Sequence, residues 1–298
     1  MAQPTPIRGL GPDSRLGDAA RRILAGRLAD VRKPEAGFQE AVDDESVHDM
    51  RVATRRLRAA LKIFRSLGGL KKLERDVKRI QDALGDVRDV HVQSAWLEGI
   101  AKEASKKPQV RAGIQSLRKK RLSELEDHEG RLHVELERWV DKTVPRLLRK
   151  LDGLEDPHRF AGRRVRDSLR QRLKRVQKRI DTYIDAADAA SAHELRKELK
   201  RLRYELEIFQ PAFRRTLDAL LEVLVPLQDG LGELHDADVR LELFERLAAE
   251  SAPRERKSAR ALLPIVREER TKRAAEIARE VQRWRTEEIP KRLRRMLT

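Results

Sequence analysis

Apolar residues recur along this chain every three or four positions, and no segment shows the sustained alternation that is typical of strands. This spacing places the apolar side chains on one face of a helix. Glycines, prolines and polar clusters interrupt the pattern and separate one helix from the next. We predict eight helices, at residues 13–31, 46–67, 70–105, 108–151, 163–186, 191–210, 214–250 and 254–297.

The eight predicted helices fall into two sets of four. Glycines and a proline between residues 153 and 162 mark the seam, and the second helix of each set carries the same motif at an offset of 145 residues. We therefore predict an all-α fold of two four-helix bundles related by an internal pseudo-twofold axis. The domain is expected at residues 13–298, with halves at 13–152 and 158–298, after a flexible lead-in at 1–12.

The repeated motif is a basic helix with a histidine near its start. At about 100° per residue, the histidine and the basic residues share one face, and apolar residues occupy the other. The first copy extends to Lys62 without an acid on this face, whereas the second has Glu207 at the matching position. Like charges at this spacing repel one another, so the pattern favours an anion-binding track over an ordinary solvated face. The matching pairs are His48 and His193, Arg51 and Arg196, Arg55 and Lys200, Arg56 and Arg201, and Arg58 and Arg203.

Each motif histidine lies in what resembles a capping box. Ser46 precedes Asp49 by three residues, and Ser191 precedes Glu194 by the same spacing. This pattern predicts a serine N-cap and places each histidine in the first helical turn, where free N–H groups and the helix dipole favour anions. The alternative is that each histidine only links helix ends through a carboxylate. The sequence leaves these two interpretations open.

A second motif is repeated downstream, at residues 81–89 and 228–236, with an offset of 147. Both copies contain Gln-Asp-x-Leu-Gly inside a predicted helix. Gly85 and Gly232 leave room for a close neighbour, and we favour tight helix packing as the reason. The carboxylates nearby could bind a metal, but we favour pairing with the arginines and predict no metal site.

The charge balance points to a polyanionic partner. The chain of 298 residues has a formal net charge of +17 and contains no cysteine. A positive excess of this size favours binding to polyanions. The absence of cysteine excludes disulfides and fits a reducing compartment, and no apolar segment reaches the length of a membrane span. We expect a cytoplasmic protein that does not bind membranes.

The two motifs, in this order and in both halves, resemble the CHAD family, the conserved histidine α-helical domain. The resemblance extends from about residue 13 to residue 297. It implies a basic central groove or pore, binding of inorganic polyphosphate and association with polyphosphate granules. It also implies a binding site on the basic faces of the first two helices of each half, to which we add Lys62. The predicted site residues are Arg27, His48, Arg51, Arg55, Arg56, Arg58, Lys62, Arg172, His193, Arg196, Lys200, Arg201 and Arg203.

Two other functions compete with polyphosphate binding. The positive charge would also support non-specific binding of nucleic acid, but aromatic residues make up only 4% of the chain, and single-strand binders rely on aromatic stacking. An enzyme is not expected, because the sequence has no glycine-rich phosphate loop and no defensible pairing of a nucleophile with a base. No cofactor is predicted.

Overall fold

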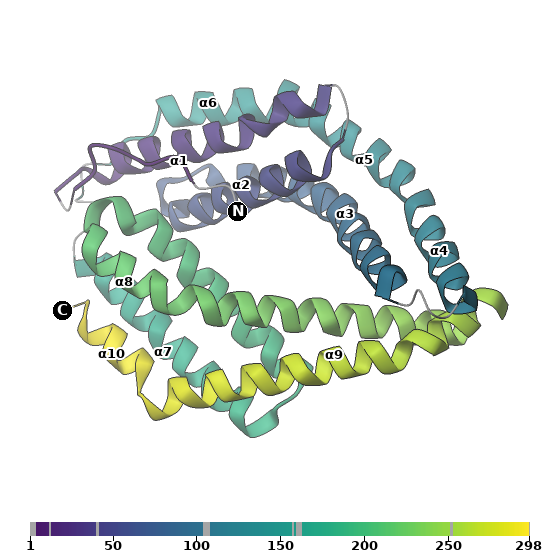
Figure 1. Ribbon diagram of the computed structural model, residues 1–298. Coiled ribbons are helices and arrows are strands. Elements are labelled where there is room, and N and C mark those ends of the chain that lie inside the picture. Colours follow the sequence, from purple (N-terminus) through teal and green to yellow (C-terminus); the bar gives the residue numbers. More distant parts are fainter. Residues whose placement is uncertain are drawn as a thin grey trace. The chain divides into compact units, whose positions relative to one another are not determined.

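The computed structural model describes residues 4–11, 13–39, 42–103, 108–156, 158, 163–250 and 253–297, and most of these residues are helical. No strand occurs within these ranges, which confirms the all-α prediction (Figure 1). Short 3₁₀ helices lie at Pro34–Gln39 and Arg65–Leu67. The α-helices are α1 (Leu16–Arg32), α2 (Asp44–Ile63), α3 (Leu70–Glu103), α4 (Pro108–Ser123), α5 (Leu125–Arg138), α6 (Val144–Asp152), α7 (Arg163–Ala186), α8 (Ala189–Glu250), α9 (Pro253–Thr286) and α10 (Ile289–Arg295).

Helix boundaries differ from the prediction in several places. The predicted helix at 108–151 is divided into α4, α5 and α6, with a π-helical turn at Trp139–Thr143. The predicted helices at 191–210 and 214–250 run on as α8, but Phe213 inside it has non-helical angles (φ −132°, ψ 30°). Pro211 accounts for this local break, because proline cannot donate the i→i−4 hydrogen bond and crowds the preceding turn.

The chain forms two compact units that differ from the predicted halves. Unit 1 contains Met1–Val92, Leu122–Val165 and Tyr204–Arg214; unit 2 contains Gln93–Arg121, Arg166–Arg203 and Arg215–Thr298. The end of α3 and most of α4 therefore group with the second half of the sequence, because their apolar side chains belong to a core built with α8 and α9. This core consists of Leu97, Ile114, Leu117, Phe244, Ala248, Ala259, Leu262 and Val266.

Part of the predicted flexible lead-in lies against α1. Ile7 is buried, and a Cβ added at Gly26 would come within 2.3 Å of Ile7 Cδ1. The backbone N–H of Thr5 donates to Asp30 Oδ1 at 3.1 Å, and the Thr5 hydroxyl also contacts Asp30. Residues 4–11 are thus docked on α1 by packing and hydrogen bonds, and the prediction of a flexible lead-in does not describe them.

The predicted capping boxes are wrong, because both helices begin earlier than the serines. Asp43 is the N-cap of α2 and accepts a hydrogen bond from the Ser46 amide at 2.8 Å. Before α8, Asp188 accepts from the Ser191 amide at 2.7 Å. These bonds lower the pKa of both aspartates. His48 and His193 are consequently the fifth residues of their helices, beyond the free N–H groups of the first turn.

A nearly buried ion pair links α2 to α8 within unit 1. Arg56 Nε lies 3.2 Å from Glu207 Oε2, and the two side chains are 9% and 13% exposed. Glu207 is the residue that interrupts the second basic face. Its carboxylate supplies a partner for an arginine that the fold removes from water, a contact that the helical spacing alone did not reveal.

We predict that Glu207→Ala lowers the free energy of unfolding by about 2 kcal/mol or more, because it removes a carboxylate partner of the buried Arg56 charge. Urea denaturation monitored by circular dichroism measures this change. Glu222→Ala, at an exposed position of the same helix, is the matched control. The double variant Arg56→Met, Glu207→Leu should recover much of the loss; a Glu207→Ala effect equal to the control would contradict the assignment.

Candidate functional site

A first basic cluster lies in unit 1, where α2 meets α3. We define it as His48, Arg51 and Arg55 on α2 with Arg88 on α3. Arg51 lies close to Gly85, since a Cβ added there would be 3.7 Å from Arg51 Nε. Arg51 Nη2 is also 3.8 Å from Asp89 Oδ1. A Cβ at Gly85 would make only an ordinary van der Waals contact with this arginine, so the packing there does not require a glycine.

His48 is a neutral hydrogen-bonding group in this cluster. Its side chain is half-buried, and burial is the main cause that lowers its pKa, followed by the positive charge of Arg88. In the described part of the chain no hydrogen bond to His48 is found, so it does not link helix ends through a carboxylate. A neutral imidazole retains one N–H donor, which is suited to an anion oxygen.

A second basic cluster lies in unit 2, within α8 on both sides of its central break. We define it as His193, Arg196, Lys200 and His235. The rings of His193 and His235 have centroids 5.4 Å apart. Burial lowers the pKa of His235 to about 4, and the charges of Arg196 and Lys200 contribute to this shift. Burial, reinforced by these neighbouring cations, therefore keeps His235 neutral.

The two clusters have equivalent origins in the repeated motifs, but they differ in composition. His235 occupies the position of Arg88, and Lys200 that of Arg55. Arg88 also pairs with Asp44, which contacts His91 at 3.0 Å. Near Gly232, a Cβ would meet nothing within 4 Å, so tight helix packing does not explain that glycine.

Three of the predicted site residues are paired with carboxylates that are buried or nearly buried. Arg27 is 4% exposed, and its Nη1 donates to Asp30 Oδ2 at 2.8 Å. Arg56 pairs with Glu207 as described above. Arg172 Nη1 donates to the buried Glu198 at 2.7 Å. These guanidiniums stabilise helix contacts, and the structure does not bring them into either cluster.

The remaining predicted residues flank the clusters and also have carboxylate neighbours. Arg201 is exposed and donates to Glu198 at 3.0 Å. Glu74 contacts both basic residues at the end of α2, which lowers the pKa of this carboxyl against the opposing effect of burial. An anion could therefore bind these remaining residues, which are Arg58, Lys62, Arg201 and Arg203, only by competing with their carboxylate partners. The distances are 2.5 Å for Arg58 to Glu74, 3.6 Å for Lys62 to Glu74, 3.0 Å for Arg201 to Glu198 and 3.5 Å for Arg203 to Asp229.

Arg88 and His235 were not among the residues predicted for the site. Both lie three residues after the glycine of the repeated Gln-Asp-x-Leu-Gly motif. Arg88 lowers the pKa of His48 through its charge, and the His235 ring contacts the His193 ring. The signal was present in the sequence as a polar residue that recurs with the second motif. Only the packing of that segment beside the histidine helix identifies these residues as parts of the clusters.

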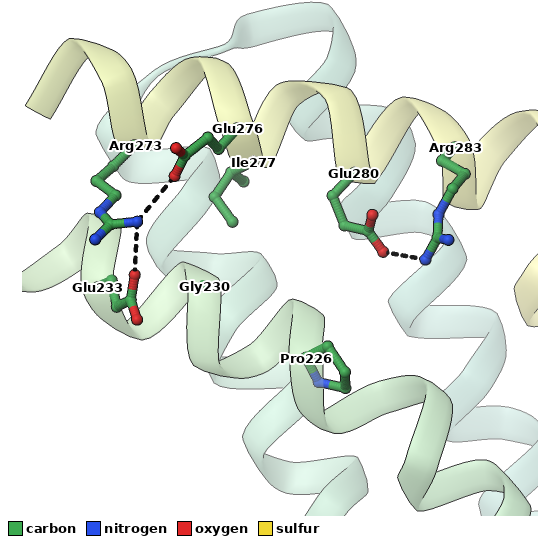
Figure 2. Close-up of a pocket in the computed structure, with 8 residues that line it drawn as sticks. All are labelled: Pro226, Gly230, Glu233, Arg273, Glu276, Ile277, Glu280 and Arg283. Carbon is green, nitrogen blue, oxygen red and sulfur yellow. Dashed lines mark hydrogen bonds and ion pairs between the residues drawn. The ribbon is translucent and has the colours of Figure 1, made fainter.

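A pocket of about 290 Å³ lies elsewhere in unit 2, between α8 and α9 (Figure 2). Its two arginines point to carboxylates of the pocket: Arg273 lies 3.0 Å from both Glu233 and Glu276, and Arg283 lies 2.5 Å from Glu280. The pocket contains none of the predicted site residues. Its mixed and internally paired charges do not match the two clusters.

Metal ligands and membrane-spanning helices are two further features that the described residues could contain. Within those ranges no group of three or more histidine, aspartate or glutamate side chains is placed to hold a metal ion. Among the same residues, every helix is too short or too polar to span a bilayer.

Two solved structures are similar to this protein over most of its length. The crystal structure of the CHAD domain from the plant Ricinus communis is similar, with a TM-score of 0.69 and 26% sequence identity over 95% of this chain and 97% of that chain. PptA from Streptomyces chartreusis is similar in fold, with a TM-score of 0.66 and 16% identity over 90% of this chain and 100% of that chain. A search of curated proteins found no significant match.

The family assignment rests on a match to a sequence model as well as on fold. The model described as CHAD domain matches residues 22–245, which include both histidine motifs and both Gln-Asp-x-Leu-Gly motifs. This match spans most of the chain, and it confirms the resemblance deduced from the motifs. The chain belongs to the CHAD family.

Proposed function

We propose that this protein binds inorganic polyphosphate through its two basic clusters. The observation that carries the proposal is the gathering of cations around partly buried histidines. Burial is the main cause that lowers the pKa of His48 and of His235, and the charges of Arg88 in one cluster and of Arg196 and Lys200 in the other lower these pKa values further. Positive charge gathered beside a partly buried group is stabilised when an anion binds. Membership of a family known for polyphosphate binding supports the same ligand.

The chemistry of the clusters suits a linear chain of phosphates. Arginine donates two parallel hydrogen bonds from a planar fork and stays charged at physiological pH. Lys200 adds a point charge, and the neutral His48 and His235 add N–H donors. Successive phosphates carry negative charge without bases between them, so one polymer can occupy several basic groups. By analogy with nucleic acids, release of counterions should make the affinity fall steeply with salt.

The proposal also includes the wider arrangement inferred from the resemblance. The basic faces of both halves would form a central groove or pore around an internal pseudo-twofold axis. The protein would then act in the cytoplasm, associated with polyphosphate granules, as a binding module and not as an enzyme. Non-specific nucleic-acid binding is the competing function, and a direct competition distinguishes the two.

We predict that replacing Arg51, Arg55, Arg196 and Lys200 with alanine weakens binding of long-chain polyphosphate by about 10- to 100-fold, because four cationic contacts are lost. The salt dependence of the affinity should become shallower for the same reason. Fluorescence anisotropy with labelled polyphosphate at near-physiological salt measures both effects. Single-stranded RNA, duplex DNA and pyrophosphate serve as competitors.

The matched control removes the same charge outside the clusters. Lys71, Lys72, Lys119 and Lys257 are exposed, and their replacement with alanine should weaken binding by only a few fold. The proposed function fails if nucleic acid displaces polyphosphate from the protein at an equal concentration of phosphate groups. It also fails if the cluster variant and the control variant lose the same affinity, which would indicate attraction by net charge alone.

We also predict that polyphosphate binds more tightly as the pH falls from 7 towards 4. His235 has a pKa of about 4 in the free protein, and an adjacent phosphate raises it because the anion stabilises the imidazolium. The affinity therefore rises through the pKa of the bound state and levels off below about 4. Binding isotherms across this range, with an NMR titration of the His235 ring, test the effect.

The control for this pH dependence is His235→Gln, which keeps a hydrogen-bonding side chain but does not titrate. Its affinity for polyphosphate should change less between pH 7 and pH 4 than that of the wild-type protein. Equal pH profiles for the two proteins would show that His235 does not sense the bound polymer.

A further inference from the structure

Arg55 differs from the other arginines of α2 in its surroundings. Within the described residues it has no carboxylate partner, and its guanidinium carbon lies 6.0 Å from the centre of the Tyr204 ring. Both residues belong to unit 1, and both side chains are half-buried. The other three arginines are near acids: Arg51 with Asp89, Arg56 with Glu207 and Arg58 with Glu74.

The repeat shows that this contact is specific to the first cluster. At the position of Arg55 the second copy has Lys200, and at the position of Tyr204 the first copy has Ala59. A planar guanidinium stacks on an aromatic face, whereas a lysine ammonium is a compact, strongly hydrated charge. The two positions at which the copies differ here are therefore the positions of the two members of one cation–π pair.

We propose that Tyr204 is a positioning residue that holds Arg55 as an oriented, unneutralised cation for the polyanion. An aromatic face attracts a guanidinium without cancelling its charge, while a carboxylate at the same place would compete with phosphate. Because the ring already restricts the long Arg55 side chain, less conformational entropy is lost when the polyanion binds. This inference rests on the proposed function of the first cluster.

The same contact contributes to the choice of ligand. The ring face covered by Arg55 is not available to a base, and single-stranded nucleic acids gain much of their affinity by stacking on such faces. A polyphosphate chain has no bases and needs only the cation. The Arg55–Tyr204 pair therefore favours a polyanion without bases over single-stranded RNA.

A double-mutant cycle tests this role. The proteins are the wild type, Tyr204→Phe, Tyr204→Leu, Arg55→Ala and the double variant Tyr204→Leu, Arg55→Ala, with Arg51→Ala as the matched background one turn away. Tyr204→Leu should weaken polyphosphate binding about two- to fivefold. Tyr204→Phe should bind polyphosphate with wild-type affinity, because it keeps the aromatic ring. In the Arg55→Ala background, Tyr204→Leu should have no further effect, but it should retain its effect in the Arg51→Ala background.

Two further measurements separate positioning from general packing. The NMR signal of the Arg55 Nε–H in the ligand-free protein should lose its ring-current shift in Tyr204→Leu and keep it in Tyr204→Phe. Urea denaturation of every variant verifies folding. An unchanged Arg55 signal in Tyr204→Leu overturns the inference, as does an equal loss of affinity in the Arg51→Ala and Arg55→Ala backgrounds.

The cycle is measured in parallel with long-chain polyphosphate and with single-stranded RNA of equal charge, so that the two proposals fail separately. If the wild type prefers RNA, the proposed function is overturned, while the coupling between Tyr204 and Arg55 still decides whether the ring positions this cation. If the wild type prefers polyphosphate but the coupling is absent, only the role of Tyr204 is overturned. Arg55→Ala should reduce the preference for polyphosphate over RNA more than Arg51→Ala does, since it uncovers the ring.

Discussion

Pairing of buried arginines with carboxylates is the constraint on which the rest of this structure depends. A guanidinium removed from water costs several kcal/mol unless a well-placed acid compensates it. Arg27 and Arg56 meet this requirement through Asp30 and Glu207, and the partly buried Arg172 pairs with the buried Glu198. In a chain with a net charge of +17, the acids committed to these contacts are unavailable elsewhere. The helices can therefore pack closely around these arginines without leaving a buried charge unpaired.

This division explains why a continuous basic face has two different uses. Neighbouring residues on α2 point to different surroundings, so that Arg56 is committed to Glu207 while Arg55 lies over an aromatic ring. Burial is the main cause of the depressed pKa of His48 and of His235, and nearby cations lower both pKa values further. The positions that stabilise the fold and those proposed to bind polyphosphate thus alternate along one helix.

The sequence was sufficient to predict the helices and the family, because apolar periodicity and two ordered motifs are local signals. It misplaced the helix starts because Asp43 and Ser46 are both good capping residues, and only the hydrogen bond of the structure distinguishes them. It included Arg27 and Arg56 in the site because helical spacing defines a face but not how neighbouring elements cover it. Arg88 was left out because its relation to His48 depends on the packing of two helices.

The repeat has diverged in a way that gives the two clusters different electrostatic properties. Arg88 keeps its charge at every physiological pH, whereas its counterpart His235 is neutral unless an anion raises its pKa from about 4. The second cluster therefore gains charge only when a ligand stabilises the imidazolium, so part of its binding free energy is used to take up a proton. The first cluster has no such cost at Arg88 and attracts an approaching polyanion with charge that is already present. In the proposed function, the fixed charge of Arg88 would favour initial contact at the first cluster, and protonation of His235 would make release from the second cluster dependent on pH.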